Sequence, residues 1–272
     1  MTETPLSVND LAELHGPWVD NHFHMNAESD LAGILASADD AGVLAMVCVG
    51  TDVDSSRHCI ERAAQSDRIW ATAGVHPHDA AGGIAGLREI FVEATEQDLR
   101  LVAVGECGLD FHYDHSPRAE QRQVFSEQIS IAHEFNLPLV IHTRSAWTET
   151  FEILDSEGIP PRTVFHCFTG GPAEATGAIE RGAMLSISGI VTFPSADDVR
   201  SAVEIAPLSS LMVETDSPFL TPVPHRGRPN EPALVGLIGS RVAGVKGIDV
   251  GEVALATTRN ASAFYGLGLE VL

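Results

Sequence analysis

The chain has 272 residues, a length that suits one barrel domain of about 250 residues. Its formal net charge is −22, so it lacks the basic surface that holds DNA by counterion release; this argues against a nucleic-acid binding module more than against an enzyme whose metal ions supply positive charge. The single lysine, Lys246, lies far downstream in an expected helix, which nearly excludes Schiff-base chemistry and a carboxylated-lysine metal bridge.

The chain begins with MTETPLSVND, a polar and acidic stretch that predicts no signal peptide. No apolar stretch approaches the roughly 18 residues that a membrane span requires, so we expect no membrane association. None of the four cysteines forms a CxxC pair, and Cys48, Cys107 and Cys167 lie in expected strands. We therefore expect a reduced, cytoplasmic protein that folds as one domain over residues 1–272, with no obligate protein partner.

Short apolar, β-rich runs alternate with longer helical patterns along the chain. The expected strands are WVDNHFH from Trp18, LAMVCVG from Leu44, IWATAGVHP from Ile69, LVAVGECGLD from Leu101, PLVIHTR from Pro138, TVFHCF from Thr163, AMLSISG from Ala183 and LMVETDSP from Leu211. Helical patterns include residues 118–136 and a last helix near 250–264. Eight parallel βαβ strands favour a closed (β/α)₈ TIM barrel over an open doubly wound sheet, and no GxGxxG follows the first strand to indicate a dinucleotide site.

The first strand carries two histidines that can share one metal ion. His22 and His24 are two residues apart, so in a strand both side chains point to the same face, here the barrel interior. A lone HxH is also compatible with two packed histidines.

Four more metal-capable side chains occur at the expected ends of later strands. Glu106 ends the fourth strand, His142 the fifth, His166 the sixth and Asp216 the eighth. These are the positions where barrel enzymes place their catalytic groups. Because charged groups inside a barrel are costly unless they are paired or metal-bound, the pattern favours a metal site over a buried polar network.

Several motifs together resemble those of the TatD family of nucleases. DNHFHMN is similar to the family's D-x-H-x-H opening, and RNASAFYGL to its C-terminal N-x-x-x-F helix. Between them, in the family's order, lie GVHPH, GECGLDFHYDHSPRAEQ, PLVIHTRSA, VFHCFTGG, SISGIVTF and ETDSPFLTPVPHRGRPNEP. The resemblance runs from about Val19 to Tyr265. It implies a metal-dependent hydrolase with a TIM barrel, a deoxyribonuclease that we expect to act as an exonuclease on DNA or another nucleotide-containing substrate.

The resemblance also implies two metal ions, bound by two sets of ligands that share one carboxylate. One set is His22, His24 and Asp216, the other is His142 and His166, and the bridging carboxylate is Glu106.

Two metal ions roughly 3.5–4 Å apart can activate a water and stabilise the attacking and leaving oxygens of a phosphodiester. We assign Asp216 as the catalytic group that orients or deprotonates this water, with Glu106 as the next candidate. Histidine-rich ligation favours Zn²⁺, Mn²⁺, Ni²⁺ or Co²⁺ over a pure Mg²⁺ cage, and Mg²⁺ stays among the candidates.

Three further side chains are candidates for substrate binding. His76, at the end of the third strand, is expected either to contact a substrate phosphate or to be a hydrogen-bonded structural histidine. Arg144 lies two residues beyond His142 on the same face. Arg226, in the long loop after the last strand, is expected either to clamp phosphate or to be a surface arginine.

Two carboxylates near the metal ligands receive supporting assignments. Glu214 shares the face of Asp216 and is expected to orient a metal-bound histidine. Asp110 follows Glu106 and is expected in the next loop, within reach of the substrate.

Two other functions compete with the nuclease. An amidohydrolase that cleaves C–N or carboxyl-ester bonds would share the HxH, the later histidines and the final aspartate, but many such barrels use a lysine bridge where this chain has Glu106. A non-catalytic scaffold would have no reason to keep six costly polar residues.

Overall fold

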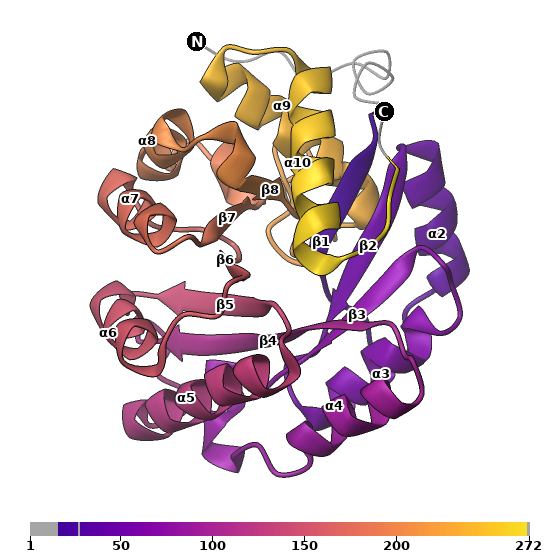
Figure 1. Ribbon diagram of the computed structural model, residues 1–272. Helices are drawn as coiled ribbons and strands as arrows, with labels where there is room; N and C mark the ends of the chain where they lie inside the picture. Colours follow the sequence, from indigo (N-terminus) through magenta and orange to yellow (C-terminus); the bar gives the residue numbers. More distant parts are fainter. Residues whose placement is uncertain (1–15, 27, 271–272) are drawn as a thin grey trace.

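The computed structural model describes residues 16–26 and 28–270, and eight parallel strands form its central barrel (Figure 1). Each strand pairs with the next one along the chain, from β1 to β8. The strands are β1 (Trp18–Phe23), β2 (Val43–Val49), β3 (Ile69–Ala73), β4 (Leu101–Asp110), β5 (Leu139–Arg144), β6 (Thr163–Phe165), β7 (Met184–Ile187) and β8 (Leu211–Val213). The expected (β/α)₈ TIM barrel is confirmed. The polar start on which the signal-peptide expectation rests, residues 1–10, lies outside the described residues.

Helices follow the strands and surround the barrel (Figure 1). They are α2 (Leu31–Asp40), α3 (Val53–Ala63), α4 (Leu87–Glu96), α5 (Arg118–Phe135), α6 (Trp147–Glu157), α7 (Pro172–Glu180), α8 (Asp197–Ile205), α9 (Val235–Lys246) and α10 (Val250–Tyr265). Short 3₁₀ turns are η1 (Pro77–Gly82), η2 (Gly189–Thr192), η3 (Leu208–Ser210) and η4 (Pro232–Leu234). The helix expected at 118–136 is α5, which ends at Asn136 in a left-handed cap, and the expected last helix is α10. Among the described residues, no helix is long and apolar enough to cross a membrane.

The first and last strands meet through backbone hydrogen bonds just beyond their ends. The amide of His24 donates to the carbonyl of Ser217 (2.8 Å), and the amide of Asp216 donates to the carbonyl of His22 (2.9 Å). These bonds place the two histidines of the first strand beside the aspartate that follows the last one.

Several strands are shorter than expected, which moves site residues into loops; β3, for example, ends at Ala73, before His76. β6 ends at Phe165 and β8 at Val213, so His166, Cys167 and Asp216 follow their strands and do not lie in them. Cys167 and Asp216 have positive φ angles of 42° and 56°, and a left-handed residue interrupts the extended backbone.

β4 ends at Asp110, as the expected strand LVAVGECGLD does, so it continues for four residues past Glu106. The pairing of β4 with β5 shifts register between Val104 and Cys107, so Glu106 lies on an irregular, bulged stretch. Gly108, at φ 132°, permits the close approach of the two strands, because a β-carbon there would collide with the carbonyl oxygen of His142. Glu106 is therefore carried by the interior of a paired strand and not by a free strand end.

Candidate metal centre

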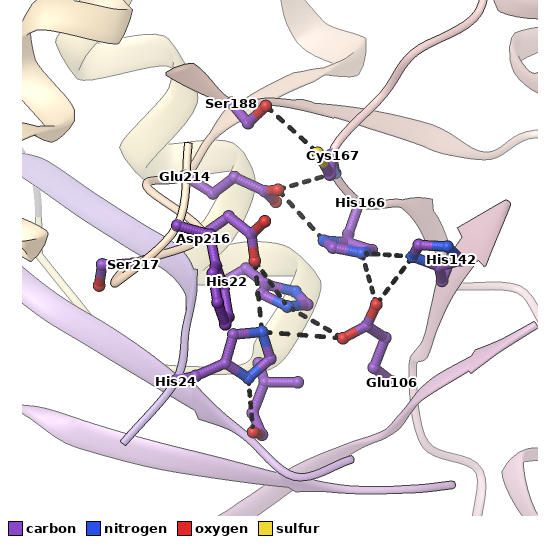
Figure 2. A network of polar contacts seen from close by, with 12 residues as sticks. His22, His24, Glu106, His142, His166, Cys167, Ser188, Glu214, Asp216 and Ser217 are labelled. Carbon is purple, nitrogen blue, oxygen red and sulfur yellow. Dashed lines mark hydrogen bonds and ion pairs between the residues drawn. The ribbon is translucent and has the colours of Figure 1, made fainter. Parts of the chain in front are cut away.

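Glu106 lies at the centre of the site, and its two carboxylate oxygens face different histidines (Figure 2). Oε1 lies 2.7 Å from His166 Nε2 and 3.0 Å from His142 Nδ1. Oε2 lies 3.4 Å from His22 Nε2 and 3.8 Å from His24 Nε2. The two oxygens therefore belong to two separate sets of nitrogen atoms, as a bridging carboxylate requires.

Asp216 completes the set on the Oε2 side. Its Oδ1 lies 3.3 Å from His24 Nε2 and 3.8 Å from His22 Nε2 (Figure 2). Two atoms that bind one ion at about 2.0–2.1 Å lie roughly 3.3 Å apart at a tetrahedral angle. The spacings at both oxygens of Glu106 are close to this value, so the structure brings all six expected ligands together. Groups of these side chains, such as His22 with His24 and Glu106, have the spacing of a metal site.

Protein oxygens fix the protonation of three of the four ligand histidines. His24 Nδ1 lies 3.1 Å from the carbonyl of Val49, and His166 Nδ1 lies 3.2 Å from Glu214 Oε1. A carbonyl or carboxylate oxygen only accepts, so each of these nitrogens donates and the proton stays there. The Nε2 lone pair of each ring is then left for a cation. The expected role of Glu214 agrees with this contact.

His142 is arranged in the same way but with its ring nitrogens exchanged. Its Nε2 donates to Asp110 Oδ2 (3.0 Å), which leaves Nδ1 facing Glu106. Asp110 was expected in a loop near the substrate; instead it is the buried last residue of β4, and it holds a ligand histidine. Its position four residues after Glu106 on one strand was the available signal, since even spacing favours a common face.

His22 shows why a cation fits the centre. The ring is fully buried and stacks on His166 with centroids 3.8 Å apart, yet neither ring nitrogen has a hydrogen-bond partner. A buried polar atom without a partner is costly. A cation bound between Nε2, Glu106 and Asp216 would satisfy this nitrogen, so the side chains present fit a metal ion.

The charges of the centre shift pKa values in opposite directions. Burial alone raises the pKa of Glu106, but the facing histidines, His166 first, outweigh it and hold that pKa well below its usual range. Burial also acts on Asp216, but contact with His24 keeps its pKa below the ordinary value. For His24, burial lowers the pKa, whereas Asp216 and Glu106 outweigh burial and raise the pKa to about 9. The centre therefore holds protons at neutral pH, and a cation would have to displace them to bind.

His76 lies beside the centre and points a protonated nitrogen toward it, whereas His142 faces Glu106 with its unprotonated nitrogen. The Nδ1 of His76 accepts the backbone N–H of His78 (3.1 Å), so the ring proton of neutral His76 is on Nε2, which faces Glu106 Oε1 at 3.4 Å. Burial lowers the pKa of His76 to about 4, so the ring is neutral at pH 7. This nitrogen is placed as a hydrogen-bond donor at the edge of the site.

The two expected phosphate-binding arginines lie in different surroundings. The Arg144 guanidinium lies over the ring of Tyr113, with Cζ 4.7 Å from the centroid. Arg226 packs over Phe193 (4.1 Å), and its Nη1 donates to the carbonyl of Thr221 (3.1 Å). Arg144 therefore lies against a neighbour of the centre, whereas Arg226 is held within the loop that follows β8.

A separate surface hollow lies at the opposite end of the barrel. Residues at the beginnings of β6 and β7, with Asn260 and Phe264 of α10, line it. None of the metal-capable side chains borders it, so the chemistry is confined to the ends where the strands terminate.

Comparisons with known proteins agree with this geometry. The family described as "TatD related DNase" matches residues 19–266. The "Uncharacterized metal-dependent hydrolase YabD" of Bacillus subtilis is 36% identical over 260 residues, which are 90% of this chain and 98% of that protein. The "3'-5' ssDNA/RNA exonuclease TatD" of Escherichia coli K12 is 34% identical over 245 residues, 88% and 94% of the two chains. The crystal structure of YJJV, a TatD homolog from Escherichia coli K12, superimposes with a TM-score of 0.86 at 26% identity and covers 92% of this chain and 98% of its own.

Proposed function

This chain belongs to the TatD related DNase family, and we propose that its metal-dependent nuclease activity uses two divalent cations to shorten single-stranded DNA or RNA from the 3' end. The observation that carries the proposal is the Glu106 carboxylate, whose two oxygens face two separate sets of nitrogen atoms. The ligands assigned to the cations are His22, His24, Glu106, His142, His166 and Asp216. The polarity and the single-stranded substrate rest on the exonuclease relatives.

Each side chain of the centre has an assigned part in phosphodiester hydrolysis. When bound, two cations at such a site lower the pKa of water and stabilise charge on the attacking and leaving oxygens. The pKa of Asp216 lies below its ordinary value, so the carboxylate is ionised at neutral pH, and its position beside the centre assigns it as the proton acceptor for the attacking water. Its Oδ1 faces His22 and His24, which assigns proton acceptance to Oδ2.

Binding and orientation of the phosphate fall to groups beside the centre. His76 offers an N–H at Nε2 and is neutral at pH 7, so it donates to a phosphoryl oxygen without adding a charge. Arg144, two residues beyond His142 on β5, is assigned to supply a positive charge for the phosphate, in a chain whose net charge is −22. Arg226 is the third candidate and would have to leave Phe193 to reach the substrate.

The set of assigned ligands favours zinc, manganese, nickel or cobalt, because four of the six ligands are imidazoles. We also propose a reducing, cytoplasmic location, since the four cysteines are all thiols, even though the sulfurs of Cys48 and Cys59 lie 2.8 Å apart.

The test combines metal analysis with digestion of a labelled single-stranded oligonucleotide. Protein purified without chelator is expected to contain two cations per chain and to release nucleotides from the 3' end, and EDTA is expected to stop the release. His22→Ala should lower the bound cations to one, whereas His133→Ala, on the outer helix α5, should retain both. Bound metal with intact DNA would contradict the nuclease and favour an amidohydrolase.

A further inference from the structure

Four large apolar side chains are well exposed in the described part of the chain, and two of them stand beside the metal centre. Phe219 is 59% exposed and Tyr113 52%; the others, Leu44 and Ile205, lie near the starts of β2 and β8, at the opposite end of the barrel. Single exposed apolar side chains are common on protein surfaces, so it is the position of these two rings, and not their exposure alone, that suggests a role.

Phe219 is held outward by a well-bonded loop. Its amide donates to the carbonyl of Asp216 (2.9 Å), and its carbonyl accepts from Asn230 Nδ2 (2.6 Å). The ring lies edge-on to the ring of His24, with centroids 6.0 Å apart. Because the backbone is fixed on both sides, the ring keeps its place directly beside a metal ligand, with most of its surface in solvent.

Tyr113 is held in a comparable way on the loop after β4. Its amide donates to Asp110 Oδ1 (2.9 Å), the same carboxylate group that orients His142. The ring runs parallel to the ring of His115, with centroids 5.5 Å apart and planes inclined by 3°, and the guanidinium of Arg144 lies against it. Half of the ring is still exposed, so this stack forms a partly open aromatic rim.

The contacts of the two aromatic residues lead to different oxygens of the Glu106 carboxylate. Phe219 adjoins His24, which faces Oε2. Tyr113 is connected through Asp110 to His142, which faces Oε1. A phosphate placed between the two sets of ligands would therefore have one aromatic ring on each side, where the two neighbouring nucleosides must lie.

The charge of the protein makes contacts to the bases more important than usual. At a net charge of −22, little affinity comes from counterion release along the backbone. Arg118, near the Tyr113 loop, is paired with Asp114 at 2.6 Å. Stacking of bases on aromatic rings is tolerant of sequence and independent of the net charge, and proteins that bind single strands use it widely.

From these observations we propose that Phe219 and Tyr113 stack with the nucleobases on the two sides of the scissile phosphate, so that the centre selects substrates whose terminal bases are unpaired. The proposal rests on the proposed nuclease function. Base pairing hides the faces of a nucleobase in a duplex stack, so a blunt duplex would not offer them to either ring. The two aromatics are thus substrate-binding residues that determine strand specificity, separate from the ligands that carry the chemistry.

The test compares Phe219→Ala and Tyr113→Ala with Phe219→Trp and Tyr113→Phe in the metal-loaded enzyme. Ile205→Ala is the matched control, because it removes an equally exposed apolar side chain at the far end of the barrel. Single strands with 2-aminopurine at the terminal positions and phosphorothioate linkages report binding by fluorescence quenching, and unmodified strands report KM and kcat. Each alanine variant is expected to weaken binding and raise KM about 5- to 150-fold, with kcat and metal content close to those of the unmutated enzyme. The Phe219→Trp and Tyr113→Phe variants are expected to keep KM close to that of the unmutated enzyme.

A substrate with an abasic nucleotide next to the scissile phosphate separates stacking from other effects. The unmutated enzyme should lose affinity for it, and one of the alanine variants should show no further loss. The proposal would be overturned by alanine variants that match Ile205→Ala in KM and quenching. It would also be overturned if the alanine variants lost affinity for blunt duplexes and for single strands to the same extent. If the unmutated protein quenches the single strand through these rings but does not cut it, the stacking stands and the nuclease function fails.

Discussion

Asp110→Asn is the substitution that tests most directly how the second cation is held. Asp110 Oδ1 accepts the backbone N–H groups of His112 (3.0 Å) and Tyr113 (2.9 Å), and Oδ2 accepts from His142 Nε2 (3.0 Å) and His78 Nε2 (3.2 Å). Asparagine keeps the size and one acceptor oxygen, which the two backbone N–H groups will retain. The amide nitrogen then faces the two histidines, and it cannot accept a proton from either.

The expected loss follows from the tautomer of His142. With an amide N–H opposite Nε2, the neutral ring is driven to accept at Nε2 and to carry its proton on Nδ1, the atom that faces Glu106 Oε1. The lone pair assigned to the cation is then lost unless the ring gives up its favourable contact. Removing such a carboxylate partner typically weakens a metal site about 10- to 100-fold, or roughly 1.4–2.7 kcal/mol. The loss should fall on one cation only, because His22, His24 and Asp216 make no contact with Asp110 in the described structure.

The assay is a competition titration against a chromogenic chelator, which resolves the two binding steps. Asp155→Asn is the control, since this exposed aspartate on α6 pairs with Arg181 far from the centre. One step should weaken in Asp110→Asn and the other should remain within about twofold, with an unchanged melting temperature under saturating metal. Two steps that weaken together, or neither, would refute the tautomer argument and leave Asp110 as a purely structural residue of the loop.

Three further outcomes are expected. Asp216→Asn should lower kcat by at least about 10²–10⁴-fold with little change in KM, measured at saturating metal with occupancy checked; a variant with two bound cations and near-normal kcat would leave Asp216 as a ligand only. EDTA should abolish activity without unfolding the barrel, because the apolar core forms independently of the centre, and a collapse of the circular dichroism spectrum would contradict this. Metal affinity should rise with pH up to about 9, because the raised pKa of His24 means that protons compete with the cation until the pH passes that value; an affinity that is flat between pH 5 and 9 would count against histidine ligation.

The sequence predicts the barrel from the alternation of strands and helices, and it predicts that six metal-capable side chains gather at one end of it, whereas their division into two ligand sets comes from the family resemblance and stays a prediction. His22 and His24 are two residues apart in a strand, so their common face follows from the pleat without knowledge of the fold. His142 needs only its position late in an apolar run. The barrel then brings these residues together, because all strands of a TIM barrel end at one face.

The features that the sequence predicted wrongly depend on contacts between distant segments. The expected strand LVAVGECGLD ends at Asp110, as β4 does, but Asp110 was assigned to the loop near the substrate, and the neighbouring strand makes it the partner of His142 instead. His166 and Asp216 lie just beyond short strands, because Cys167 and Asp216 adopt left-handed backbone conformations. The residue types at these two positions do not predict that conformation. The tautomers of the histidines depend on hydrogen-bond partners that are distant in sequence. The same holds for the stacking of His22 on His166, so residue spacing predicts neither feature.

The hydrogen bonds that join the first strand to the loop after the last one also set an order of assembly during synthesis. Glu106, His142 and His166 all precede β7 and β8 in the chain, so the residues of one half of the centre are synthesised before those two strands. The other half needs Asp216, whose amide reaches back to the carbonyl of His22, and so it forms only when nearly four-fifths of the chain has emerged. Because chains emerge at roughly 5–20 residues per second, a nascent or prematurely ended polypeptide spends its time without a complete centre. A polypeptide that ends before Asp216 therefore lacks the carboxylate that lies beside His22 and His24.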